Sequence, residues 1–463
     1  MNILPSKVWG LLIAGFCLFS AGRAADAVTL RIGAARADIT PDPEVLNWVT
    51  GKPYKEILDR IFVQALVVDD GSQKVAILRW DLVDVSESAR DEVRKRISSA
   101  LQIPAENILI NASHNHSAPW APVYTDDYRG KERDVWWVLR HMPSQNDEPH
   151  FKKWMGQLLD QSLKATQGAV AALQPATLSI ARVSIGEYVQ NRRPRAPRWG
   201  VVPAPAGAGR NRNPDPAVLA GGATFGALDR TMNILSFRDG TERIIASLFQ
   251  MSCHSVSIYP SNPGLSADWP GPATAKIAAA LGGAEAMFLQ GCTGDINPWR
   301  RGREAVEEMG KALGEKARAA EAEHARLVPG KLHVARAELG LPLTPAAQAR
   351  TGLESVRAEV QVIVCGPVAI VALPGEVMTE IGMAIRDRSP FPQTLVLGYS
   401  NGNGVHYIGL PGEKARGGYE AGVAGAGTDE CGAMLVETAL RLINDVYGRA
   451  QPTTPTRTTQ GTR

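Results

Sequence analysis

Short apolar runs alternate with longer segments of helical periodicity along most of this 463-residue chain, and this alternation constrains the fold more than any other feature. A short apolar run bounded by turn residues is typical of a buried strand. Apolar residues at intervals of three and four are typical of a helix that packs one face on a sheet. The alternation therefore predicts one α/β domain over 28–450, with a mixed β-sheet core, surrounding helices and long loop insertions.

The individual segments follow from the same patterns. Asp70-Gly71 and Asp239-Gly240 each separate two apolar runs, which favours a hairpin at both places. The predicted strands are Ile61–Val68, Lys74–Val83, Asn107–Ala112, Asn233–Phe237, Arg243–Gln250, Ala286–Leu289, Glu359–Val364, Val368–Leu373 and Thr394–Gly398. The predicted helices are Ser86–Leu101, Phe151–Leu173, Pro272–Leu281, Arg303–Ala325 and a segment that begins at Val377.

The first 24 residues have the pattern of a secretory signal peptide. Lys7 gives a positive start, Val8–Ser20 is a short apolar run, and small residues around Ala24 suit cleavage. The apolar run is too short to span a bilayer comfortably. We therefore expect an exported protein, either periplasmic or secreted.

Three other stretches depart from the alternation. Trp120–Pro149 is rich in aromatic and charged residues, and Arg192–Gly226 is rich in Pro, Gly and Arg. Long insertions of this kind in a compact domain are usually functional loops or disordered. The tail at 451–463 consists mainly of Thr, Pro, Gln and Arg, so we expect it to be disordered.

Charge and cysteine content narrow the function classes. The net charge is only +3, with acids and bases in similar number, so no nucleic-acid partner is indicated. Four cysteines follow the signal segment, at 253, 292, 365 and 431. An oxidising compartment permits two disulfides among them, although buried free thiols or a single bridge are at least as compatible with their wide spacing.

Histidines follow two of the predicted strands. His114 and His116 come directly after Asn107–Ala112, and their spacing of two places both side chains on one side of an extended chain. His254 follows Arg243–Gln250 in the same manner. Each histidine taken alone is more compatible with a satisfied core or capping residue than with a metal ligand.

Polar residues also follow three later apolar strands. Asp295 and Asn297 lie in a Gly-Asp-Ile-Asn-Pro turn, whose residue types turn chemistry alone would favour. Glu376, in Pro-Gly-Glu, suits a metal ligand or a base, or the start of the next helix. A glycine-rich segment from Gly398 leads to Tyr407 and Tyr419.

Five sites directly after strands indicate one shared active site, because ligands of open α/β sheets gather beyond the carboxyl ends of the strands. Asp268, in a short acidic loop, suits a residue that orients a ligating imidazole, or simply the start of a helix. Imidazole and carboxylate side chains without thiolates suit a catalytic zinc with an open position for water.

In order and spacing these motifs resemble the catalytic domain of the neutral/alkaline ceramidases, zinc amidases that cleave the amide of N-acyl sphingosine. The similarity covers roughly 31–447 and includes the opening segment Arg31–Thr40. The resemblance implies one Zn²⁺ per chain. Its implied ligands are His114, His254, Glu376 and Tyr407.

The resemblance also implies roles near the scissile bond. His116 and Tyr419 would donate hydrogen bonds to the carbonyl oxygen, and Arg192, in Asn-Arg-Arg-Pro, would line the site. Asp295 and Asn297 would belong to the catalytic residues as well. Asn297 stands where the family has a functionally important serine, and an amide side chain does not serve as an acyl-accepting nucleophile.

The sequence therefore predicts an exported zinc-dependent amidohydrolase that acts on a ceramide or a similar N-acyl lipid. Zinc would activate a water molecule for attack on the amide. Transient contact with a membrane surface is expected for a lipid substrate, and the oligomeric state stays open. The alternatives are a metallohydrolase for another amide or an ester, and an exported binding protein of the same fold without catalysis.

Overall fold

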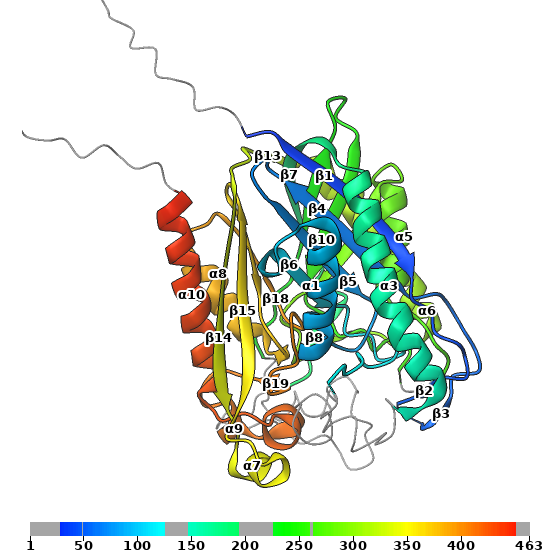
Figure 1. Cartoon of the computed structure of the whole chain (residues 1–463), viewed down its shortest axis with the longest axis vertical. Helices are drawn as coiled ribbons and strands as arrows, with labels where there is room; N and C mark the ends of the chain where they lie inside the picture. Colours follow the sequence, from blue (N-terminus) through cyan, green and yellow to red (C-terminus); the bar gives the residue numbers. More distant parts are fainter. Residues whose placement is uncertain (1–27, 49, 126–146, 194–225, 260–262, 451–463) are drawn as a thin grey trace, which may run out of the picture.

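The computed structural model describes residues 28–48, 50–125, 147–193, 226–259 and 263–450. The predicted signal peptide, the tail and most of the two insertions lie outside these residues, so those predictions stay predictions. Within them the chain is a mixed α/β structure built on two sheets (Figure 1). This arrangement confirms the predicted fold class.

The larger sheet has nine strands in the order β11-β10-β9-β7-β1-β4-β5-β6, with β13 paired to β7. The β5–β6 and β10–β11 pairs are parallel and the other pairs are antiparallel, so the sheet is mixed. Its strands are β1 (Leu30–Asp38), β4 (Phe62–Asp69), β5 (Lys74–Trp80), β6 (Ile108–Ala112), β7 (Gln174–Ser184), β9 (Thr231–Arg238), β10 (Ile244–Met251), β11 (Glu285–Gln290) and β13 (Ala325–Leu327).

The smaller sheet has four strands in the order β14-β15-β16-β18, in which only the β16–β18 pair is parallel. Its strands are β14 (Leu332–Pro342), β15 (Ser355–Cys365), β16 (Val368–Ala372) and β18 (Gln393–Leu397). Three short pairs complete the strand inventory of the described residues: β2 (Leu46–Asn47) with β3 (Lys52–Pro53), β8 (Val189–Asn191) with β12 (Ile296–Pro298), and β17 (Glu376–Val377) with β19 (Tyr407–Ile408).

Helices cover the outer face of each sheet, which gives four layers (Figure 1). The helices on the larger sheet are α1 (Glu87–Leu101), α3 (Pro149–Ala171), α5 (Pro270–Ala280) and α6 (Arg303–Glu321). The helices on the smaller sheet are α7 (Pro345–Thr351), α8 (Thr379–Arg388) and α10 (Cys431–Ala450). Three short helical turns remain: η1 (Ala105–Asn107), α9 (Glu413–Arg416) and η3 (Tyr419–Ala424).

Period-two alternation explains the layering. In β4, Val63 and Ala65 face the core shared with α1 and α3, whereas Leu66 and Val68 face the smaller sheet. Side chains on opposite faces of one strand therefore enter two different cores. The core between the sheets joins Leu66 to Ile370 of β16 and holds the two sheets face to face.

The predicted strands and helices are all present, with ends that differ by a few residues. The main differences are that β5 ends at Trp80 rather than Val83, α6 ends at Glu321 rather than Ala325, and β15 begins at Ser355 rather than Glu359. The sequence analysis assigned no element to β1, β7, β14 or α10. Residues 335–341 of β14 do alternate between inward-facing apolar and exposed residues, but the segment contains Ala and Glu residues, which are depleted in strands.

Two further features bear on the sequence analysis. Cys253, Cys292, Cys365 and Cys431 are free thiols, so among these four no disulfide forms. In the part of the chain that the structure describes, no helix combines the length and apolarity that a membrane span requires.

Candidate active site

Two histidine-bearing loops meet at the carboxyl ends of β6 and β10. His116 N donates to the Ser255 carbonyl (3.2 Å), and the Ser255 hydroxyl donates to the Ser113 carbonyl (2.7 Å). The Nε2 atoms of His114 and His116 lie 2.9 Å apart, and the ring centroids of His114 and His254 lie 4.5 Å apart. His114, His116 and His254 thus form one group, with ligand atoms within 4.8 Å of one another.

Glu376 enters the same group from the smaller sheet. It lies in β17, just after β16, and its Oε2 lies 3.1 Å from Nε2 of both His114 and His254. The preceding Gly375 has φ +76°, and a Cβ there would lie 2.7 Å from the carbonyl oxygens of Asn403 and His406. A side chain at 375 would therefore push the Glu376 segment away from the site.

The backbone fixes which ring nitrogens point into the site. His114 Nδ1 lies 2.7 Å from the Val83 carbonyl and His254 Nδ1 lies 3.0 Å from the Ile296 carbonyl. A ring nitrogen beside a carbonyl must donate, so in the neutral rings both Nε2 atoms are unprotonated acceptors. When both Nε2 atoms are unprotonated, three acceptor atoms converge, and they repel one another unless a proton or a metal cation lies between them.

A metal ion fits this donor set. Bonds of about 2.0–2.1 Å in tetrahedral geometry place ligand atoms roughly 3.3 Å apart, close to the 3.1 Å observed here. Both imidazoles also have the carbonyl partner on the outer nitrogen that orients metal-bound histidines. His114, His254 and Glu376 therefore fit a metal, and His116 lies close enough to be a further ligand.

Burial sets the protonation states that this fit requires. It lowers the pKa of His254 to about 3 and that of His116 well below its usual value, so both rings are neutral near pH 7. Burial alone would raise the pKa of Glu376. The surrounding imidazoles, that of His114 first, instead hold the pKa well below its usual range, and Glu376 is a carboxylate.

Two fully buried amide side chains hold the strand ends together behind the histidines. Asn111 Nδ2 donates to the Gly398 carbonyl (2.8 Å), and Gln290 N donates to Asn111 Oδ1 (2.8 Å). Gln290 Nε2 donates to the carbonyls of both Ser113 and Cys253. Ser113 directly precedes His114, and Cys253 directly precedes His254. Gln290 therefore fixes the separation of these two histidines.

Two tyrosines of the glycine-rich segment reach the site in different ways. The Tyr399 ring stacks on His114 with centroids 4.1 Å apart, and its hydroxyl donates to Glu376 Oε2 (3.3 Å). Tyr407, the predicted ligand, is paired in register with Glu376, but its hydroxyl accepts a hydrogen bond from Arg192 (2.9 Å). The tyrosine in hydrogen-bond contact with the histidine–carboxylate group is thus Tyr399.

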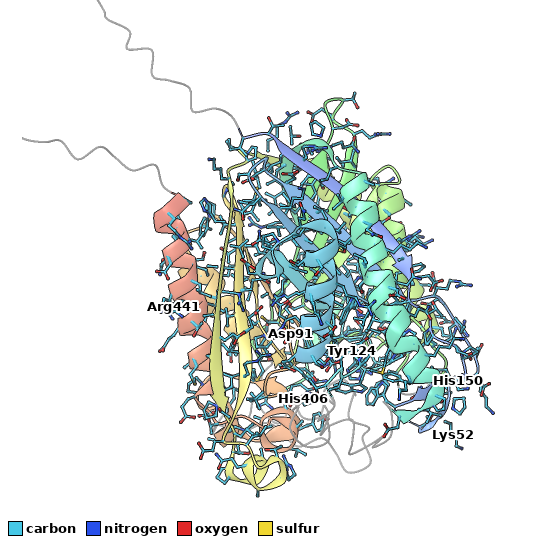
Figure 2. The ribbon with its side chains drawn as sticks, in the orientation of Figure 1. Lys52, Asp91, Tyr124, His150, His406 and Arg441 are labelled. Carbon is cyan, nitrogen blue, oxygen red and sulfur yellow. The ribbon has the colours of Figure 1, made fainter. Side chains whose placement is uncertain are left out.

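His406 is a site residue that the sequence analysis did not single out. Its Nδ1 lies 3.4 Å from Glu376 Oε1. Figure 2 shows it at the end of the sheets opposite the start of β1 and the end of α10. His114, Tyr399, Asn401 and His406 all have φ between +48° and +66°, a conformation that residues other than glycine adopt mainly where the surroundings enforce it.

Arg192 connects several of the predicted residues. Its Nε pairs with Glu420 (2.7 Å), and its NH2 donates to the Gly294 carbonyl as well as to Tyr407. Burial alone would lower the pKa of Arg192, but Tyr407, Glu420 and Glu376 raise it above its usual value. Arg192 therefore supplies the site with permanent positive charge besides any metal.

The remaining predicted residues lie at the edge of the site. The Tyr419 ring packs against Tyr407, with centroids 5.8 Å apart. Both carboxylate oxygens of Asp295 are engaged, one by Thr379 N (2.8 Å) and one by Asn191 Nδ2 (2.7 Å). Asp295 thus ties β8 to the start of α8, and it is not a member of the histidine–carboxylate group.

Asp268 does not orient a ligating imidazole. Its carboxylate accepts hydrogen bonds from the backbone nitrogens of Ser257, Ile258 and Trp269. The orienting partner of His254 is instead the Ile296 carbonyl. Asp268 lies just before α5, so the alternative that it marks the start of a helix agrees with the structure.

An aromatic wall, formed by Trp48, Trp120 and Tyr259, borders the histidines. Trp48 and Tyr259 stack with centroids 5.6 Å apart, and both lie within 5.5 Å of the His116 ring. The sequence analysis missed this wall, because Trp48 belongs to a loop far from the motifs. Of the three residues, Trp120 alone gave a signal, because it begins the aromatic-rich insertion at 120–149.

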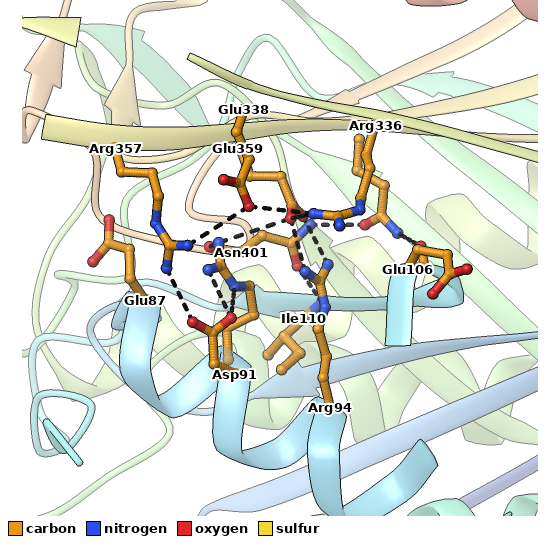
Figure 3. Close-up of polar contacts among 12 residues, drawn as sticks. Glu87, Asp91, Arg94, Glu106, Ile110, Arg336, Glu338, Arg357, Glu359 and Asn401 are labelled. Atoms are coloured by element: carbon orange, nitrogen blue, oxygen red, sulfur yellow. Dashed lines mark hydrogen bonds and ion pairs between the residues drawn. The ribbon is translucent and has the colours of Figure 1, made fainter. Parts of the chain in front are cut away.

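Helix α1 anchors the segment that carries Tyr399 and His406. Glu87 Oε1 accepts hydrogen bonds from the backbone nitrogens of Asn403 (3.0 Å) and Gly404 (3.1 Å), and Arg90 donates to the Asn401 carbonyl (2.9 Å). Figure 3 shows Glu87 and Asn401 beside the ion pairs that join α1 to the smaller sheet. The strained segment is therefore held by side chains from one rigid element.

Comparison with known proteins places this arrangement among solved structures. No protein-family model matches the chain. The neutral ceramidase from Pseudomonas aeruginosa superimposes with a TM-score of 0.72 at 17% sequence identity, covering 93% of this chain and 76% of that one. A ceramidase in complex with C2 gives a TM-score of 0.71 at 16% identity, covering 92% and 77%. This chain therefore has the fold of the neutral ceramidases.

Proposed function

We propose that this chain is an exported zinc-dependent amide hydrolase whose substrate is a ceramide or a similar N-acyl lipid. The observation that carries the proposal is the convergence of two imidazoles and a carboxylate, those of His114, His254 and Glu376, at the strand ends of this fold. The two solved structures compared above are both named ceramidases. Export rests on the signal-peptide pattern of residues 1–24.

Zinc bound by His114, His254 and Glu376 would polarise the amide carbonyl and supply a nucleophilic water near neutral pH. The Arg192 guanidinium, held by Glu420, offers fixed positive charge to the carbonyl oxygen as negative charge develops there. His116 and Tyr419 are proposed as further donors to that oxygen. The aromatic wall of Trp48, Trp120 and Tyr259 offers an apolar surface for the lipid part of the substrate.

A second candidate is hydrolysis of another amide or of an ester by the same residues. Asn297 favours it, because this residue replaces the serine that the resemblance leads one to expect in the site. Fatty-acid release from a short-chain ceramide, compared with release from simpler N-acyl amines and matched esters, distinguishes the two candidates.

The test of the proposed function combines zinc content with turnover. We expect purified wild-type protein to contain about one zinc per chain and to release fatty acid from a short-chain ceramide. His254→Ala and Glu376→Ala should each lose most of the zinc, and turnover should fall by at least about 10²-fold. His150→Ala, at an exposed histidine that pairs with Asp42, should retain both properties.

Three outcomes contradict parts of the proposal. Wild-type zinc content retained in His254→Ala would refute the ligand assignment. Zinc without ceramide turnover would leave a metallohydrolase with another substrate. Wild-type protein that binds no zinc would refute the central claim.

A further inference from the structure

Asn297 occupies a protected position next to the candidate metal ligands. It lies in β12, which pairs antiparallel with β8, and no part of it is exposed. The neighbouring Ile296 places its side chain in the apolar core and its carbonyl oxygen against His254 Nδ1. Because side chains alternate along a strand, Asn297 points away from that core.

The polar contacts of Asn297 define how its amide is oriented. Arg192 NH1 lies 3.4 Å from Asn297 Oδ1, and a guanidinium can only donate. The oxygen of the amide therefore faces Arg192, and the nitrogen faces the other way. The same guanidinium contacts Tyr407, so Asn297 belongs to the Arg192 side of the site.

The nitrogen of this amide is the part of the side chain without a protein partner. Asn297 Nδ2 is buried, and among the described residues it has no hydrogen-bond acceptor. A buried donor without an acceptor carries a desolvation penalty, so native proteins rarely keep one without a reason. An amide that serves only to hold Arg192 would need only its oxygen.

We propose that Asn297 is a catalytic residue that donates an Nδ2 hydrogen bond to the carbonyl oxygen of the substrate, beside Arg192. This inference rests on the proposed hydrolytic function. The amide neither gains nor loses a proton, and its hydrogen bond strengthens as negative charge develops on the oxygen. Asn297 thus acts as a hydrogen-bond donor. Its amide side chain cannot serve as a nucleophile.

Three substitutions test the donor. Asn297→Leu keeps a similar volume without a donor, whereas Asn297→Ser and Asn297→Ala differ from each other by one hydroxyl group. We expect kcat to fall about 10²–10³-fold in Asn297→Leu with little change in KM. The kcat of Asn297→Ser should exceed that of Asn297→Ala at least about tenfold, because only the serine side chain retains a hydrogen-bond donor.

Each variant is measured on an N-acyl amine and on the ester of the same acid, since both develop charge on the same oxygen. Zinc content and Tm show whether the variant is folded and loaded. If Asn297→Leu fails to fold, the comparison of Asn297→Ser with Asn297→Ala decides the question.

The outcomes separate this inference from the proposed function. Equal kcat in the wild type and Asn297→Leu, or in Asn297→Ser and Asn297→Ala, would overturn the donor role and leave amide hydrolysis standing. Ester turnover that depends on Asn297, without amide turnover, would support the donor role and overturn the proposed amidase. Wild-type protein that cleaves neither substrate would contradict both.

Discussion

At the scale of single residues, Tyr399 contacts two of the candidate metal ligands, His114 and Glu376. Its ring stacks on His114, and its hydroxyl donates to Glu376. Its backbone nitrogen donates to the Gly375 carbonyl (3.0 Å), and its carbonyl accepts from Ala112 N (3.0 Å). One residue thus fixes the orientation of two ligands that come from different sheets, and its positive φ shows that the surroundings hold it there.

We expect Tyr399→Phe to weaken zinc binding roughly tenfold to 100-fold, because outer hydrogen bonds to metal ligands contribute to affinity on this scale. The Phe ring keeps the stacking on His114, so the loss isolates the hydroxyl. Competition with a chromophoric chelator measures the affinity, and Tyr447→Phe, on α10, is the matched control. Unchanged affinity in Tyr399→Phe would show that the hydroxyl has no role in holding Glu376.

At the scale of secondary-structure elements, α1 connects the two sheets through buried charges. Arg94 donates two hydrogen bonds to Glu359 of β15, both 2.8 Å, and two to the Ile108 carbonyl at the start of β6. Arg336 also faces Glu359 (Figure 3). Arg90 NH1 lies 3.9 Å from Glu359 Oε2. Burial alone would raise the pKa of Glu359, but the hydrogen bonds of Arg94 and the charges of the three arginines hold it below its usual value.

This lowered pKa predicts a pH-dependent contribution to stability. A carboxyl group whose pKa is lower in the folded state stabilises the protein fully above its unfolded pKa of about 4.3, and loses this effect as the pH falls through the folded value. Glu359→Gln should therefore reduce the free energy of unfolding by about 3 kcal/mol at pH 7, because it leaves buried arginines unpaired. The deficit should shrink below roughly pH 4.

Urea unfolding of both proteins at pH 7 and in acid measures the difference. Glu338→Gln, which removes an exposed partner of Arg336, should change stability by less than about 1 kcal/mol. A deficit in Glu359→Gln that is independent of pH would contradict the assigned ionisation of Glu359.

At the scale of the whole molecule, the candidate metal site lies where the two sheets meet. His114 and His254 follow β6 and β10 of the larger sheet, whereas Glu376 follows β16 of the smaller one. A metal bound by all three connects the sheets at their carboxyl ends, beyond the apolar core that they share. Its binding energy then adds to the stability of the folded chain.

Removal of zinc should accordingly lower the Tm, and added zinc should restore it. Free zinc at about 1,000 times its Kd stabilises the folded state by about 4 kcal/mol. Differential scanning calorimetry with and without a chelator measures the shift, and His254→Ala should show none. A wild-type Tm that does not respond to the chelator would show that the metal does not connect the sheets.

Much of the fold was accessible from the sequence because its signals are local. Buried runs such as Ile108–Ala112 and the two Asp-Gly turns depend on neighbouring residues alone, and they predicted the corresponding strands. The sequence also predicted that His114, His254 and Glu376 lie in one site, because each of them follows an apolar strand. His114 and His116 do converge, although His114 has left the strand with φ +57°, so strand alternation was not the cause.

Tertiary structure alone decided the rest. β14 pairs along its whole length with β15 although its Ala and Glu residues favour strands only weakly, because pairing and packing against α10 stabilise it. Three contacts of the site depend on segments that lie far apart in the chain. They are the hydrogen bond of Tyr399 to Glu376, the position of His406 beside Glu376, and the contact of Arg192 with Asn297. The sequence by itself thus determined most strands and helices and the residue types that follow them, because these features depend on neighbouring residues. Packing of the two sheets determined which of those residues touch, because such contacts depend on both sheets at once.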